Sequence, residues 1–89
     1  MSRPRRNYRI RKNLAKVMAD GTWRSAAEVA IEMSNRKMKF TSPNQLGSLL
    51  TNTPGFENRR ATERWRFGLG MYRLYNQSLF EQWIEVKKP

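Results

Sequence analysis

Residues 42–50 read SPNQLGSLL, a stretch that carries two independent signals for the start of a helix. Ser42 is a preferred capping residue with a glutamine three positions later, and Pro43 occupies the first helical position, where its missing N–H costs nothing. Three leucines then recur at helical spacing and give the helix one apolar face: Leu46, Leu49 and Leu50. We therefore predict a helix that packs through its leucines and ends at residues 53–55, Thr-Pro-Gly.

The opposite side of this helix is uncharged and rich in short hydrogen-bonding side chains. Such a face suits close approach to the major groove of DNA, because Asn and Gln can pair with adenine edges. A helix that meets only water would more often carry Lys and Glu, so we expect groove contact rather than an ordinary polar surface. The outward residues are Asn44, Ser48 and Thr51, with Gln45, Gly47 and Asn52 on the flanks.

Two further helices are predicted upstream. An apolar stripe with helical spacing begins at Tyr8, and Asp20-Gly21 ends that helix because glycine readily adopts the left-handed conformation of a helix end. Ser25 and Glu28 form a capping box that begins the next helix. Trp23 precedes this cap in a segment long enough only for a small extended piece, and we expect its ring in the core.

Two short strands and a closing helix are predicted downstream. Residues 56–60 and 71–75 are the strand candidates, and the glycine-containing basic stretch 61–70 between them is typical of a long hairpin loop. Residues 78–81, Ser-Leu-Phe-Glu, repeat the capping-box pattern and predict the start of the last helix.

The composition excludes most catalytic chemistry. The 89 residues leave room for one small domain and contain neither cysteine nor histidine. Disulfides, thiolate or histidine metal sites, and Ser-His or Cys-His catalysis all need residues that the sequence lacks. The carboxylates are scattered and form no metal-binding cluster. We therefore expect a protein that is not an enzyme, with no metal, cofactor, small-molecule ligand or membrane span.

The charge is strongly positive and unevenly distributed. A net charge of +11 attracts polyanions, above all nucleic acid. Residues 1–12 hold six cations and no acid, and residues 54–75 hold five arginines. We expect both stretches to contact phosphates, the alternatives being a solubilising tail and an exposed charged hairpin. The candidate DNA-binding residues are Arg3, Arg5, Arg6, Arg9, Arg59, Arg60, Arg64 and Arg66 for phosphates, and Ser42, Asn44, Gln45, Ser48, Thr51 and Asn52 on the helix.

The order of these elements resembles the winged helix-turn-helix family over about residues 9–75. The segment DGTWRSAAEVA, residues 20–30, is similar to the family's passage from the first helix through a stub strand into the second. SPNQLGSLL stands where the recognition helix belongs, and PGFE (54–57) to YRLY (72–75) resembles the strand–wing–strand end. The link at residues 35–41 is longer than the tight turn of simple helix-turn-helix proteins. The resemblance implies a mainly α fold with a small two-stranded β-hairpin and an added C-terminal helix.

We divide the chain into a disordered basic arm (1–7), a winged-helix domain (8–75) and a C-terminal helix with its tail (76–89). The expected function is double-stranded DNA binding in transcription control, in the cytoplasm and at the nucleoid. Two alternatives stay open, because the fold alone does not decide function: a protein that coats DNA regardless of sequence, and a module that binds a protein assembly such as RNA polymerase. Phe80, Trp83 and Ile84 either cover the core or pair two copies into a homodimer.

Overall fold

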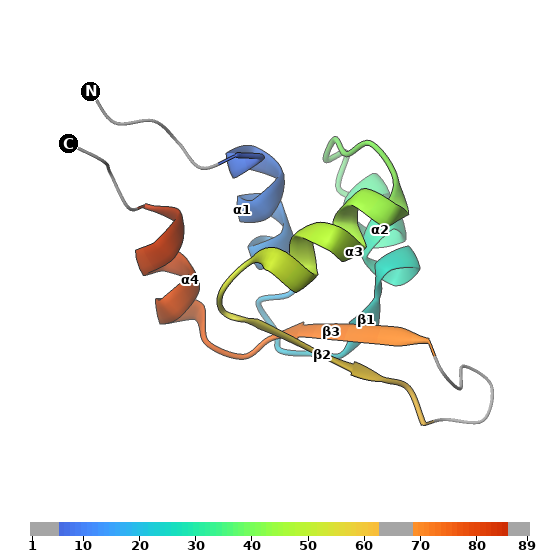
Figure 1. Cartoon of the computed structure of the whole chain (residues 1–89). Helices are drawn as coiled ribbons and strands as arrows, with labels where there is room; N and C mark the ends of the chain where they lie inside the picture. The colour runs from blue at the N-terminus through green and yellow to red at the C-terminus, as the bar shows by residue number, and fades with distance from the viewer. Residues whose placement is uncertain (1–5, 63–68, 86–89) are drawn as a thin grey trace.

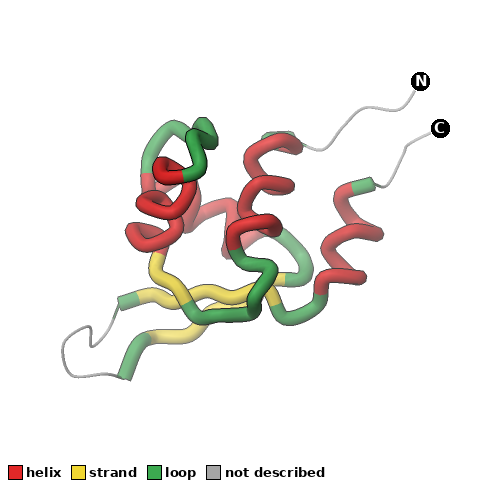
Figure 2. Tube along the Cα trace, turned by 180° about the vertical axis from the view of Figure 1, so that it is seen from behind, coloured by secondary structure: helices red, strands yellow, loops and turns green. Residues whose placement is uncertain are grey.

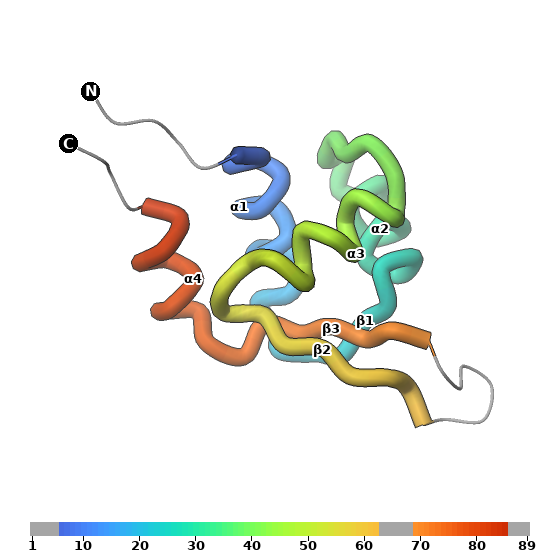
Figure 3. The backbone as a smooth tube through the Cα atoms, viewed as in Figure 1, coloured from blue at the N-terminus to red at the C-terminus, as the bar shows by residue number. Residues whose placement is uncertain are grey.

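A computed structural model describes residues 6–62 and 69–85, which form four helices and a small three-stranded antiparallel sheet (Figure 1). Three helices lie over one face of the sheet, and the fourth lies beside the first (Figures 1 and 3). The elements are α1 (Tyr8–Val17), β1 (Arg24–Ser25), α2 (Ala26–Asn35), α3 (Pro43–Asn52), β2 (Phe56–Arg60), β3 (Gly70–Leu74) and α4 (Gln77–Ile84).

The helix starts follow local capping chemistry. The predicted capping box of α2 is confirmed, since the Ser25 hydroxyl accepts from the Glu28 N–H at 3.2 Å and the Glu28 carboxylate accepts from the Ser25 N–H at 2.8 Å. The predicted cap of α4 at Ser78 is wrong. The Asn76 side chain accepts from the Leu79 N–H at 2.9 Å instead. Asparagine caps as well as serine does, and here it comes two residues earlier, directly after β3.

The sheet has one strand more than the predicted hairpin. β3 lies in the centre, with β2 on one side and β1 on the other, both antiparallel to it. Arg24 pairs with Tyr72, and Ser25 pairs with Met71. The short extended piece predicted before the second helix is therefore a strand, and its pairing brings the start of α2 against the hairpin (Figure 2).

The core lies between the helices and the inner face of the sheet. Successive strand residues alternate between the two faces, so the paired Phe56 and Leu74 point toward the helices and are buried there. The predicted leucine face of α3 is confirmed, each leucine being at most 5 % exposed. The other large members of this core are Leu14, Val17 and Met18 from the α1 region, Val29 and Met33 from α2, and Phe80 and Ile84 from α4.

Trp23 lies on the outer face of the sheet, and the expectation that it joins the core is wrong. Its ring is half-buried beneath two guanidinium groups, those of Arg59 and Arg73, whose central carbons stand 4.7 and 4.8 Å from the ring centroid. Arg73 also forms an ion pair with Glu57 on the neighbouring strand. The pairing of β1 with β3 carries Trp23 to this side, where the flat arginine groups can stack on it.

Arg11 links α1 to the ends of α3 and α4. Although it belongs to the cation-rich stretch 1–12, Arg11 is only 9 % exposed. Its Nε donates to the Arg6 carbonyl at 2.9 Å, and its Nη1 donates to the buried hydroxyl of Thr53, the residue that ends α3. Its guanidinium also lies 5.0 Å from the centroid of the Trp83 ring. Arg11 therefore acts in the interior and is not a surface phosphate contact.

The apolar face of α4 packs inside the same chain. Phe80 and Ile84 are 3 % and 2 % exposed, and the Phe80 ring meets Phe56 edge-on at a centroid distance of 5.8 Å. Trp83 is half-buried against the core under Arg11. The interpretation that these residues cover the core is thus confirmed for Phe80 and Ile84.

Candidate nucleic-acid interface

The exposed face of α3 is uncharged, as its sequence predicts. Asn44, Ser48, Thr51 and Asn52 are all exposed, on the side opposite the buried leucines. The Thr51 hydroxyl donates back to the Gly47 carbonyl at 2.9 Å. Within residues 6–62 and 69–85, the side chains of the other three exposed residues form no hydrogen bond. Their donors and acceptors therefore point to solvent, ready for an external partner.

Two predicted contact residues are engaged in building the start of α3. The Ser42 hydroxyl accepts from the Gln45 N–H at 3.2 Å, and the Gln45 side-chain oxygen accepts from the Thr41 N–H at 2.9 Å. The two side chains are half-buried. Together they fix the angle at which the chain enters the helix. The external hydrogen-bonding capacity of α3 thus rests mainly on Asn44, Ser48 and Asn52.

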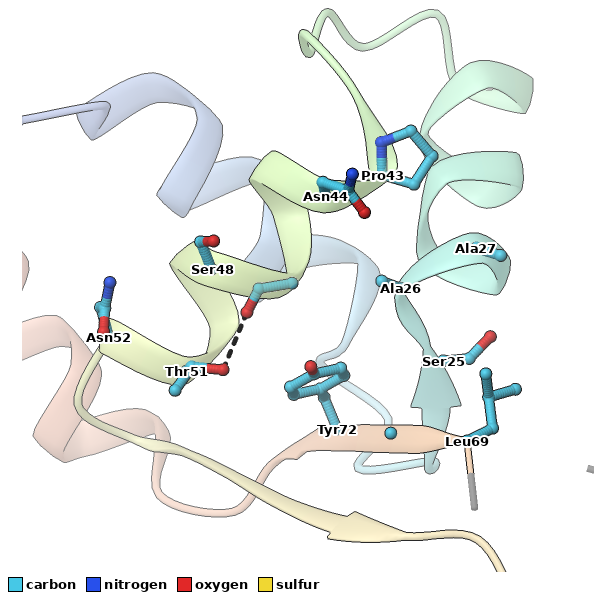
Figure 4. Close-up of a pocket in the computed structure, with 12 residues that line it drawn as sticks. Ser25, Ala26, Ala27, Pro43, Asn44, Ser48, Thr51, Asn52, Leu69 and Tyr72 are labelled. Carbon is cyan, nitrogen blue, oxygen red and sulfur yellow. Dashed lines mark hydrogen bonds between the residues drawn. The ribbon is translucent and has the colours of Figure 1, made fainter. Parts of the chain in front are cut away.

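A groove, here called the α3 groove, runs along this exposed face with a volume of about 680 Å³ (Figure 4). One wall is α3, and the other is formed by the start of α2 and by β3, from which Tyr72 rises toward the helix (Figure 4). A Cβ on Gly47 would stand 3.5 Å from the Tyr72 hydroxyl and 3.7 Å from the Cβ of Ala26, which are ordinary van der Waals contacts, so the two walls lie within side-chain contact of each other. Leu69, which is 47 % exposed, stands on the rim.

The two arginines at the end of β2, Arg59 and Arg60, lie on opposite faces of the sheet. Arg59 is half-buried on the outer face of the sheet, where it stacks on Trp23. Arg60 is exposed and, by the alternation of the strand, belongs to the same face as Phe56 and Tyr72, the face that borders the α3 groove. Of the two, Arg60 is therefore the better placed to meet a ligand of α3. Two further predicted residues, Arg64 and Arg66, lie outside the described part of the chain.

The predicted contact residues of the stretch 1–12 fall partly within and partly outside the described residues. Arg6 and Arg9 are exposed, while Arg3 and Arg5 lie outside the described residues. Arg9 stands on the first turn of α1 and lines a second groove together with Lys37 and Lys39 from the segment before α3. These two lysines were not among the predicted contacts, although the basic character of the segment before Ser42 is visible in the sequence.

Ion pairs neutralise part of the positive charge. Among the described residues they join Lys12 to Glu85, Arg24 to Asp20, Arg36 to Glu32 and Arg73 to Glu57. Within residues 6–62 and 69–85, cations outside these ion pairs are found at and before α1 and in the segment that leads into α3. The cations without an ion pair in this part of the chain are Arg6, Arg9, Lys16, Lys37 and Lys39.

Arg24 is held by the turn between α1 and β1. Its two terminal nitrogens donate to the Asp20 carboxylate at 2.9 and 3.0 Å, and the Thr22 N–H donates to the same group at 3.0 Å. These hydrogen bonds, chiefly the pair from Arg24, hold the pKa of Asp20 well below its ordinary value of 3.8. The ion pair fixes the turn that brings β1 to the sheet, so Arg24 has a structural task.

No helix within residues 6–62 and 69–85 has the length and apolar character needed to cross a membrane. Comparisons of the chain with models of known protein families, with curated proteins and with solved structures found no match. The case for its function therefore rests on the geometry of the α3 face and on the charges around it.

Proposed function

We propose that the chain is a small double-stranded DNA-binding domain of the winged-helix type that acts in transcription control at the nucleoid. The element order α1–β1–α2–α3–β2–β3 and the strand order β1-β3-β2 are compatible with the family that the sequence resembles. In this proposal α3 is the recognition helix and the β2–β3 hairpin is the wing.

The observation that carries the proposal is the exposed face of α3. It is uncharged, its side chains are short, and its amide and hydroxyl groups have no partner among the described residues except at Thr51. The major groove is about 12 Å wide and admits a helix whose face carries no bulky side chain. Asn44 and Asn52 have the donor–acceptor pair that matches an adenine edge, while Ser48 permits close approach.

The cations around α3 would hold the phosphates on both sides of the groove. Arg60 stands on the hairpin side, and Arg9 stands on the first turn of α1. The proposal also keeps the predicted contacts Arg3, Arg5, Arg6, Arg64 and Arg66. Contacts of this kind supply affinity without sequence preference, whereas the α3 face supplies the preference.

The proposal can be tested with duplex DNA and the isotope-labelled protein. Amide chemical-shift changes should concentrate on residues 43–52 and on the hairpin, and should spare the outer side of α4. If roughly six to eight phosphates are neutralised, log affinity should fall against log salt with a slope of about −5 to −7. A duplex that shifts every surface amide alike would favour a DNA-coating protein. No binding at low salt would refute DNA binding and leave the protein-assembly alternative.

A further inference from the structure

A second groove, here called the linker groove, lies between the first half of α1 and the segment that joins α2 to α3. Its volume is about 520 Å³, and it shares no lining residue with the α3 groove. Ile10, Met38 and Phe40 give it an apolar lining. All three side chains pack against the core on one side yet are only half-buried. The linker groove is therefore a partly uncovered extension of the core.

Three exposed cations surround this apolar lining: Arg9, Lys37 and Lys39. None of them has an ion pair among the described residues, in contrast to four other cations of this part of the chain. The backbone places the two lysines at the surface. Lys37 adopts a left-handed conformation with φ of 59°, and the next N–H, that of Met38, returns to the Met33 carbonyl at 2.9 Å. Met38 is thereby held against α2, with an exposed lysine on either side.

The occupant that fits this combination is acidic and carries apolar side chains. A phosphate backbone would match the cations but would leave the apolar lining unused. A second copy of this chain would bring a net charge of +11 toward an already positive surface. The stretches 1–5 and 86–89 of the chain contain no Asp or Glu, so neither supplies a cluster of acidic side chains.

We propose that the linker groove binds a short acidic segment of a partner protein, with one or two apolar residues seated on Ile10, Met38 and Phe40 and the carboxylates facing Arg9, Lys37 and Lys39. Recognition of this kind combines an apolar anchor with charge complementarity. Because the two grooves share no residue, the partner would cover Arg9 but would leave the α3 face open to DNA. A DNA-bound copy could then recruit that partner.

The test uses a panel of synthetic peptides of about ten residues, rich in Asp and Glu, with two Leu or Phe at different spacings. Amide chemical shifts of the labelled full chain report where each peptide binds. At least one peptide should shift the amides of residues 9–13 and 37–41 and spare those of 47–52. Replacing its acids by amides, or its apolar residues by serine, should each weaken binding. No shift at the linker groove with any peptide up to millimolar concentration would overturn the proposal.

A pair of charge-matched variants separates a site from general attraction to a basic protein. Lys39→Glu and Lys16→Glu change the net charge equally, and both lysines are exposed without an ion pair in the described part of the chain. Lys39→Glu should weaken peptide binding by about five- to tenfold, because it places a repelling charge at the groove. Lys16→Glu should change it by less than about twofold. Equal weakening by the two variants would overturn the proposal. It would also be overturned if a DNA duplex, but no peptide, shifted the amides of the linker groove.

Discussion

Replacing Arg11 by alanine should destabilise the domain, although the sequence counts this residue among surface cations. The change removes two hydrogen bonds from a charged donor, to the Arg6 carbonyl and to the Thr53 hydroxyl, and a stack on Trp83. Charged hydrogen bonds contribute about 1.5–3 kcal/mol each and a partly desolvated cation–π contact about 1–2 kcal/mol. Burying the guanidinium offsets several kcal/mol of this gain. A net loss of about 2–3 kcal/mol remains.

Thermal unfolding followed by circular dichroism measures this loss. For a domain of this size the melting temperature should fall by roughly 10–20 °C. Arg9→Ala is the matched control, because it removes an exposed arginine from the same helix and should change stability by less than about 0.5 kcal/mol. The reasoning is refuted if Arg11→Ala melts within about 2 °C of the parent, or if the two variants lose equal stability.

Three further predictions concern the frame that holds α3. Gly55→Ala should unfold the domain at a lower temperature, because Gly55 has φ of 100° and a Cβ there would lie 2.8 Å from both the Asn76 carbonyl oxygen and the Phe80 Cβ. An unchanged melting temperature would contradict this. Leu49→Ala should lower the free energy of unfolding, measured in urea, by about 2–4 kcal/mol, because it leaves a cavity in the core. The exposed control Ser48→Ala should change it by less than about 0.5 kcal/mol. Equal effects would show that α3 does not pack through its leucines. Folding lowers the pKa of Asp20, so the ionised carboxylate stabilises the folded state at pH values above the ordinary pKa of 3.8. This stabilisation is lost as the pH falls below 3.8 and the carboxylate becomes protonated in the folded state. The stability advantage of the parent over Asp20→Asn should accordingly shrink between about pH 4 and pH 2, and a pH-independent difference in urea titrations would contradict this.

The features that the sequence predicted are those decided by neighbouring residues. The starts of α2 and α3 could be predicted because they depend on contacts within four positions of the chain. Ser25 pairs with Glu28 at the start of α2, and Ser42 caps α3 with Pro43 in its first position. The leucine spacing of α3 likewise assigned both its buried and its exposed face. The strand candidates were right to within one residue, since β3 begins at Gly70 rather than at residue 71.

The features that were missed depend on contacts between distant segments. Trp23 reaches the outer face of the sheet only because β1 pairs with β3, a register that no local pattern specifies. Arg11 is buried because the ends of α3 and α4 meet over it, which its place in the basic stretch 1–12 did not indicate. Tyr72 became part of the α3 groove through the same sheet register. At all three positions the decisive contact comes from a segment distant in sequence, so the neighbouring residues could not predict it.

The central claim is that the exposed face of α3 reads base edges, and Asn44 tests it most directly. The measurement compares the affinity of Asn44→Ala with that of the parent on two duplexes, one selected from a random pool by the parent and one of random sequence. Arg60→Ala serves as the contrasting variant and should weaken both duplexes alike, reducing the salt slope by about one unit. Asn44→Ala should lose about 1–3 kcal/mol on the selected duplex and stay within about twofold of the parent on the random one. Equal loss on both duplexes, or no loss on either, would contradict the claim.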